Sequence, residues 1–204
     1  MKKIFLVYNL LILSAFCFAQ VNMQTLIKPG TKLVYAIEAG EQKYDFIITV
    51  KAILPAVVFD WEMTNDKKSN GTITHTAAAM LAANTMYNYF SPGQRSLDDN
   101  TLSVWLSKNS FTALTKGSRT VMLKMNTNEQ PQKMGINAED PVELKITVNG
   151  EKETVEEFVA KAVNAEGASA GDEVYFSFAN SAKMPLILRM NNGFHIVLKE
   201  IKTK

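Results

Sequence analysis

Histidine is the first residue type to consider, because it acts as general base and as metal ligand. The chain has two, His75 and His195, and neither belongs to an H-x-H or H-x-x-x-H pair that would bind a metal ion. His195 has the opposite parity to Phe194, Ile196 and Leu198, so its side chain should face away from a core strand face. We therefore expect two ordinary surface or edge histidines, and neither a metal site nor a bound cofactor.

Candidate nucleophiles are equally sparse. Cys17 is the only cysteine, and no G-x-S-x-G elbow is present to expose a reactive serine. Ser107 follows Trp105 and Leu106, and its simplest role is that of a helix N-cap. The sequence therefore predicts no catalytic residue.

Neighbouring carboxylates occur at Asp98-Asp99, Glu139-Asp140 and Glu156-Glu157. Glycoside hydrolysis needs two carboxylates that face each other across a cleft, so a glycan hydrolase using Asp98, Asp99 or a glutamate is the enzymatic alternative. The D-x-[DN]-x-[DN]-G spacing of a calcium loop is missing after Asp98. On balance the residues favour a protein that is not an enzyme.

Aromatic residues provide the candidate ligand site. Tyr87, Tyr89 and Phe90 lie together, and Trp105 follows further along the chain. If they are exposed, they offer a platform for sugar rings or a partner protein. If they are buried, they anchor a helix to a sheet. The methionine-rich composition allows an interior that opens around an apolar ligand, or serves simply as core filler.

Residues 1–19 have the pattern of an export signal. Lys2 and Lys3 precede an apolar run from Ile4 to Phe16, and Ala19 offers a cleavage site. We expect a periplasmic or extracellular protein. A lipid anchor on Cys17 is disfavoured, since the bulky Phe16 stands where lipoprotein signals usually place a small residue.

Residues 20–204 should form a single domain. No later apolar run approaches the length of a membrane span, so we expect no transmembrane segment in the mature chain. Lys2 and Lys3 account for the whole excess of basic over acidic side chains. Without them the charge is balanced, which argues against a nucleic-acid partner.

An apolar run at 33–38 and the alternation of apolar and polar residues at 43–52 and 57–63 predict three successive strands, an antiparallel meander with one buried face. Residues 65–71 should form a polar turn, and 126–138 a long loop. Further strand-like runs are predicted along the chain, at 72–76, 102–106, 121–125, 142–148, 174–178, 186–190 and 194–198.

Two helices are predicted, at 77–88 and from Ser107 to Gly117, with Phe111 and Leu114 placed to cover the meander. The segment 153–165 fits either an amphipathic helix or a strand. Asn149-Gly150 is a strong hairpin signal, so we favour a strand. The expected fold is mainly β, with a curved antiparallel sheet forming a roll or open barrel around one helix, plus a second short helix.

Three stretches resemble a family of exported bacterial domains of unknown function built as a spiral β-roll. They are GTKLVYAIEAGEQKYDFIITVK, DDNTLSVWLSKNSFTAL and MPLILRMNNGFHIVLKEI. The resemblance implies a curved antiparallel sheet wound around a helix, and it brings no catalytic residues. By analogy, related envelope sheets include carriers that shelter lipid-like groups.

The expected function is therefore an extracytoplasmic module that binds or scaffolds a component of the cell envelope. The alternative is a carrier that holds an apolar or lipid-like ligand inside the curved sheet. Its partner would be an envelope protein, a glycan or an apolar molecule. A fold by itself does not decide among these.

Overall fold

The computed structural model describes residues 21–136, 140–163 and 174–203. The predicted export signal at 1–19 lies outside the described residues, as do Glu139 and the last two residues of segment 153–165. No helix within the described ranges combines the length and hydropathy needed to cross a membrane.

The N-terminal half is the predicted meander. Strands β1 (Lys32–Ala39), β2 (Gln42–Ala52), β3 (Val57–Met63) and β4 (Asp66–His75) pair antiparallel in order, and β6 (Gly93–Ser96) joins β4 in parallel. The apolar positions of the first three strands are buried on one face, as their alternation requires. The predicted polar turn at 65–71 is wrong, because β4 already begins at Asp66 and pairs back onto β3 across a register shift.

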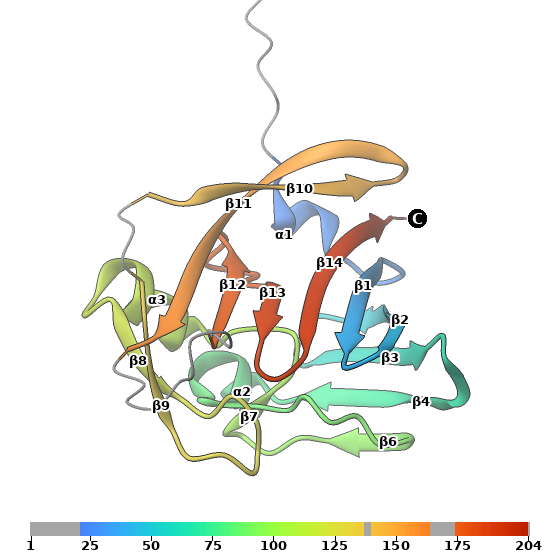
Figure 1. Ribbon diagram of the computed structural model, residues 1–204, viewed down its shortest axis with the longest axis horizontal. Helices are drawn as coiled ribbons and strands as arrows, with labels where there is room; N and C mark the ends of the chain where they lie inside the picture. Colours follow the sequence, from blue (N-terminus) through green and yellow to red (C-terminus); the bar gives the residue numbers. More distant parts are fainter. Residues whose placement is uncertain (1–20, 137–139, 164–173, 204) are drawn as a thin grey trace, which may run out of the picture.

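The C-terminal strands form a barrel. Five described strands take part: β10 (Val142–Val148), β11 (Glu151–Ala162), β12 (Tyr175–Ala179), β13 (Ile187–Asn191) and β14 (His195–Lys202). The circle closes where β10 runs parallel to the end of β14. Because β14 also pairs with β1, barrel and meander share one continuous sheet. The mainly β fold with a curved, closing sheet is therefore confirmed (Figure 1).

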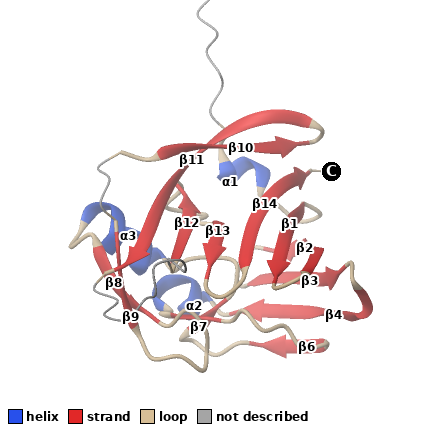
Figure 2. Cartoon of the chain, in the orientation of Figure 1, coloured by secondary structure: helices blue, strands red, loops and turns tan. Residues whose placement is uncertain are grey.

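Shorter elements flank this sheet. Strands β8 (Thr120–Leu123) and β9 (Gln132–Gly135) extend it beyond β11, whereas β5 (Thr85–Met86) and β7 (Thr101–Leu102) form a separate parallel pair. The short helices in the described residues are α1 (Met23–Leu26), α2 (Ala77–Ala82) and α3 (Lys108–Lys116). Figure 2 shows α1 beneath the arched β10–β11 hairpin. The predicted loop at 126–138 is wrong in part, since it contains β9.

The hairpin signal at Asn149-Gly150 is confirmed. Both residues have positive φ, 51° and 92°, as a type I′ turn requires, and they place Val148 opposite Glu151. Segment 153–165 is accordingly strand as far as Ala162, the end of β11.

Helix α2 is shorter than predicted. Thr76 caps its start by accepting a hydrogen bond from the Ala79 amide at 3.0 Å, but the helix ends at Ala82 and not at Asn88. The next amides bond to distant carbonyls instead: Thr85 to Asn100 at 3.1 Å, Met86 to Lys124 at 2.9 Å and Tyr87 to Leu102 at 2.7 Å. Tertiary hydrogen bonds therefore override the helix propensity of this stretch.

Helix α3 begins where predicted, with Ser107 as N-cap. Phe111 and Leu114 are buried, but in a cluster with Phe158, Phe176 and Phe178 of the barrel strands. The expectation that they cover the meander is therefore wrong. From the irregular chain between α2 and α3, Phe90 packs on Phe46 and Trp61, and Trp105 packs on Phe59 of the meander.

A close backbone approach joins β4 to β6. Gly71 and Gly93 are partners in the parallel pairing, and a Cβ on Gly71 would overlap the Gly93 carbonyl oxygen and lie 3.0 Å from Trp61 Nε1. Only glycine fits there without moving backbone.

We predict that Gly71→Ala lowers the free energy of unfolding by about 2 kcal/mol or more, because β6 must separate from β4. Urea denaturation measures the loss. Gly40→Ala is the matched control: Gly40 has φ of 58° but open space around it, so its substitution should cost only about 1 kcal/mol of backbone strain. Equal losses for the two variants would contradict the proposed clash.

Candidate functional site

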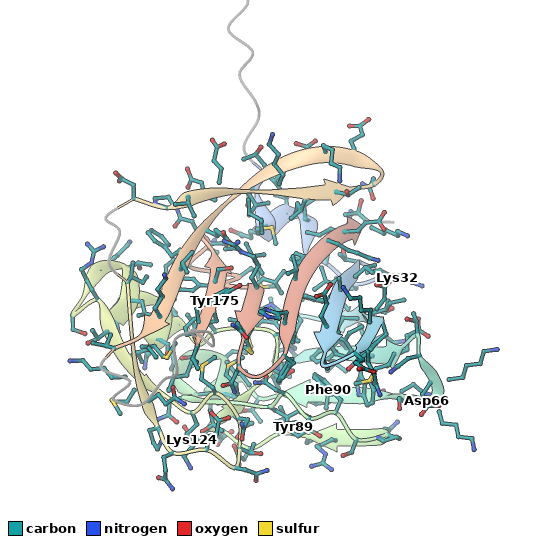
Figure 3. All side chains as sticks on the ribbon, in the orientation of Figure 1. Lys32, Asp66, Tyr89, Phe90, Lys124 and Tyr175 are labelled. Carbon is teal, nitrogen blue, oxygen red and sulfur yellow. The ribbon has the colours of Figure 1, made fainter. Side chains whose placement is uncertain are left out.

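An apolar pocket of about 260 Å³ opens on the buried face of the sheet. It lies between the inner faces of β1 and β2, the chain at 88–90 and the β13–β14 hairpin. Figure 3 labels Tyr89 and Phe90 below that hairpin, with Phe90 under the lower ends of β1 and β2. The lining residues are Tyr35, Ile37, Ala39, Tyr44, Phe46, Met63, Asn88, Tyr89, Phe90, Ser103, Val104, Ile187, Met190, Phe194 and Ile196.

Burial separates the pocket into a floor and a mouth. Tyr35, Phe46 and Ser103 are almost fully buried and belong to the floor. Tyr89 is 58 % exposed and lies 6.4 Å from the ring of Phe194, so these two rings flank the mouth. Such a gradient suits a ligand that enters between two aromatic rings and buries most of its surface.

The pocket carries no formal charge, since its described lining includes no Asp, Glu, Lys, Arg or His. Burial raises the pKa of Tyr35 well above its usual value, and burial also raises the pKa of Tyr44. Both phenols are therefore neutral at physiological pH. The Tyr35 hydroxyl is already engaged, because it donates to the Ile187 carbonyl oxygen at 2.8 Å.

Asn88 contributes an oriented amide. Its Nδ2 donates to the Met125 carbonyl oxygen and lies 3.5 Å from Met190 Sδ. Exchanging the amide atoms would place two oxygens against each other, so this orientation is fixed. Asn88 is a lining residue, and its Oδ1 stays an acceptor while Nδ2 is engaged.

Val104 holds the pocket wall in a strained conformation. Its φ is 68°, a value that β-branched residues rarely adopt and that costs about 1–3 kcal/mol. Two backbone hydrogen bonds hold the segment in place: the Ile187 amide donates to Val104 O at 2.7 Å, and the Leu106 amide donates to Pro185 O at 2.9 Å. Strain of this kind concentrates at functional sites.

The aromatic residues singled out in the sequence divide into two pairs. Tyr89 and Phe90 line the pocket. Tyr87 and Trp105 are buried in the core beside it, where Tyr87 packs on Phe90 at 5.4 Å and Trp105 on Phe59 at 5.4 Å. The four rings therefore do not form one exposed platform. Tyr87 and Trp105 belong to the core that lies behind the pocket residues Tyr89 and Phe90.

The position of His75 differs from the one expected from the sequence. It is fully buried, 0 % exposed, between the rings of Phe59 and Trp105 at 5.5 and 5.7 Å. Burial lowers its pKa to about 3, so the imidazole is neutral. Its Nε2 accepts a hydrogen bond from the Ser103 amide at 3.1 Å, which places the proton on Nδ1. The prediction of a surface or edge position was wrong for His75, whereas His195 is exposed as predicted.

The carboxylate pairs are engaged in local structure. Asp98 accepts from the Asn100 amide, and Asp99 accepts from the Thr76 hydroxyl at 2.6 Å. Glu156 and Glu157 are adjacent in β11 and so face opposite sides of the sheet. Glu157, fully buried, forms an ion pair with Arg189. Among the described residues, no three His, Asp or Glu side chains gather at a position that would hold a metal ion.

Most of the residues that line the pocket were not predicted from the sequence to belong to a site. Phe46 carried a usable signal because alternation marked it as core, and Tyr35 and Ile37 lay in an apolar run suited to a strand. That signal cannot separate a core position that touches another side chain from one that borders a cavity. Ser103 and Asn88 carried no local pattern, and their roles arise from contacts with distant strands.

Comparisons of the chain with protein-family models, with curated proteins and with solved structures found no match. The resemblance to the β-roll family therefore stays a prediction.

We predict that His75 makes the protein acid-sensitive. In the unfolded chain, His75 becomes protonated below its ordinary pKa of 6.5. In the folded chain, it stays neutral down to about pH 3. Stability is therefore fully present above pH 6.5 and falls as the pH drops through this window, by up to about 1.4 kcal/mol per pH unit. Urea denaturation of wild type and His75→Gln between pH 7.5 and 4.5 should show a shallower loss in the variant.

The control for this measurement is His195→Gln, which removes an exposed imidazole and should leave the acid slope nearly unchanged. If stability falls with pH equally steeply in wild type and in His75→Gln, His75 has the same pKa in the folded and unfolded chains. That result would contradict its buried position.

Proposed function

We propose that the protein is an extracytoplasmic, non-enzymatic binding protein that carries a small apolar ligand in the pocket beneath β1 and β2. The single observation that supports this most is the pocket itself: about 260 Å³, uncharged, and bordered by aromatic and aliphatic side chains. Its volume lies just below the usual range for ligand sites, which favours a small molecule or the buried end of a longer one.

The apolar carrier is preferred over a glycan or protein platform because of where the aromatic rings lie. Stacking on sugars needs accessible ring faces, whereas Tyr87 and Trp105 are buried. Tyr89 is exposed, but it borders the pocket mouth. An apolar molecule would bury against Tyr89, Phe90 and Phe194 together.

A carrier is preferred over an enzyme because the titratable groups are committed elsewhere. His75 is kept neutral within the core, and Asp98 and Asp99 each accept a local hydrogen bond. None of these three residues lines the pocket. The extracytoplasmic location rests on the export signal predicted at 1–19.

A fluorescent apolar probe tests the proposal. Wild-type protein should bind neutral N-phenyl-1-naphthylamine with enhanced emission. Ala39→Trp places a large ring in the pocket lining at the end of β1 and should weaken binding at least tenfold, a loss of about 1.4 kcal/mol or more.

The matched control is Ala36→Trp, three residues earlier on β1 and therefore on the opposite face of the sheet. It adds the same ring outside the pocket and should bind the probe like wild type. Absence of probe binding in wild type, or equal weakening by both variants, would refute a carrier function for this pocket. Native mass spectrometry of the purified protein gives a second reading through any co-purified ligand.

A further inference from the structure

A cluster of unpartnered polar atoms lies beside the pocket. Within the described residues, four buried side-chain atoms have no hydrogen-bond partner: Trp61 Nε1, His75 Nδ1, Ser103 Oγ and Trp105 Nε1. His75 contacts both the Ser103 amide and the Trp105 ring, so three of the four belong to one neighbourhood. Native proteins leave few buried polar groups unpaired, and each such group calls for an explanation.

Ser103 is the member of this cluster that reaches the pocket. It lines the floor, is 1 % exposed, and its own amide is occupied by His75 Nε2. The hydroxyl can both donate and accept a hydrogen bond. Asn88 lines the same pocket, and its Nδ2 donates to the Met125 carbonyl oxygen.

We propose that the ligand is a neutral amphiphile, with an alcohol or carbonyl group that hydrogen-bonds to Ser103 Oγ at the pocket floor and an apolar body that packs toward Tyr89 and Phe194. This rests on the proposed carrier function and names the ligand class for the same pocket. Supplying a partner to a buried hydroxyl recovers the free energy lost when that hydroxyl left water.

The uncharged lining favours a ligand whose polar group is neutral. No described lining residue carries a positive charge, so a carboxylate or phosphate would be desolvated without an ion partner, which is strongly unfavourable. No described lining residue is Asp or Glu, and burial raises the pKa of Tyr35 and Tyr44, so those two phenols keep their protons. An ammonium group would meet the same desolvation penalty.

Competition between two matched ligands tests this inference. Displacement of N-phenyl-1-naphthylamine by 1-octanol and by octanoate at pH 8 should show octanol binding at least tenfold more tightly. Ser103→Ala should weaken octanol about five- to tenfold, the loss of one hydrogen bond. The same substitution should raise the thermal midpoint of the free protein, since it removes an unpartnered polar atom.

Ser177→Ala is the control. Ser177 is equally buried but lies away from the pocket, and its Oγ accepts from Arg189 Nε at 3.4 Å. Its loss should lower the thermal midpoint and leave octanol binding as in wild type. If the probe binds but octanol and octanoate compete equally, or Ser103→Ala leaves octanol affinity unchanged, the ligand class is wrong while the carrier function stands. If wild type binds no probe, the carrier function itself fails.

Discussion

The fold depends on β14, which is hydrogen-bonded along both edges. One edge pairs with β1 from Lys32 to Glu38; the other pairs with β13 near the start of β14 and with β10 near its end. The last strand of the chain therefore joins the N-terminal meander to the C-terminal barrel and closes that barrel at the same time. Ile196 lies opposite Ile37 on one side and Met190 on the other, and all three line the pocket. The pocket thus exists only where the two halves are joined.

The joined sheet has an apolar face that must be covered, and its cover is irregular. Between α2 and α3 the chain forms only short strands, and it is fastened at single points, such as the bridge from Trp105 to Leu186 and the bond from Ser103 to His75. A helix laid on the same face would fill it with a regular ridge of side chains. A chain that follows the sheet at separate points packs less completely, and the space left between Phe90, Val104 and β1 is the pocket.

Sequence patterns predicted the sheet better than they predicted its cover. An apolar run located β1, alternation located β2 and β3, and Asn149-Gly150 located the turn of the β10–β11 hairpin, because these signals are local. The end of α2 and the buried position of His75 were missed, since both are decided by residues distant in sequence: Asn100, Leu102 and Lys124 for the first, Phe59 and Trp105 for the second. A pocket produces an even weaker signal in the sequence. Tyr89 and Phe90 were identified as a cluster, but the space they border is formed by strands from both halves of the chain.

Several energetically unfavourable features lie in the pocket wall or beside it. Val104 has a strained backbone, His75 is kept neutral by burial, and Ser103 and Trp105 bury polar atoms without partners. Each feature costs on the order of 1–3 kcal/mol, and a domain has only about 5–15 kcal/mol of net stability. Most of the other buried side chains are aliphatic or aromatic. In the carrier function proposed above, Ser103 gains a hydrogen-bond partner when the ligand binds, which accounts for a pocket wall whose own hydrogen bonds are incomplete.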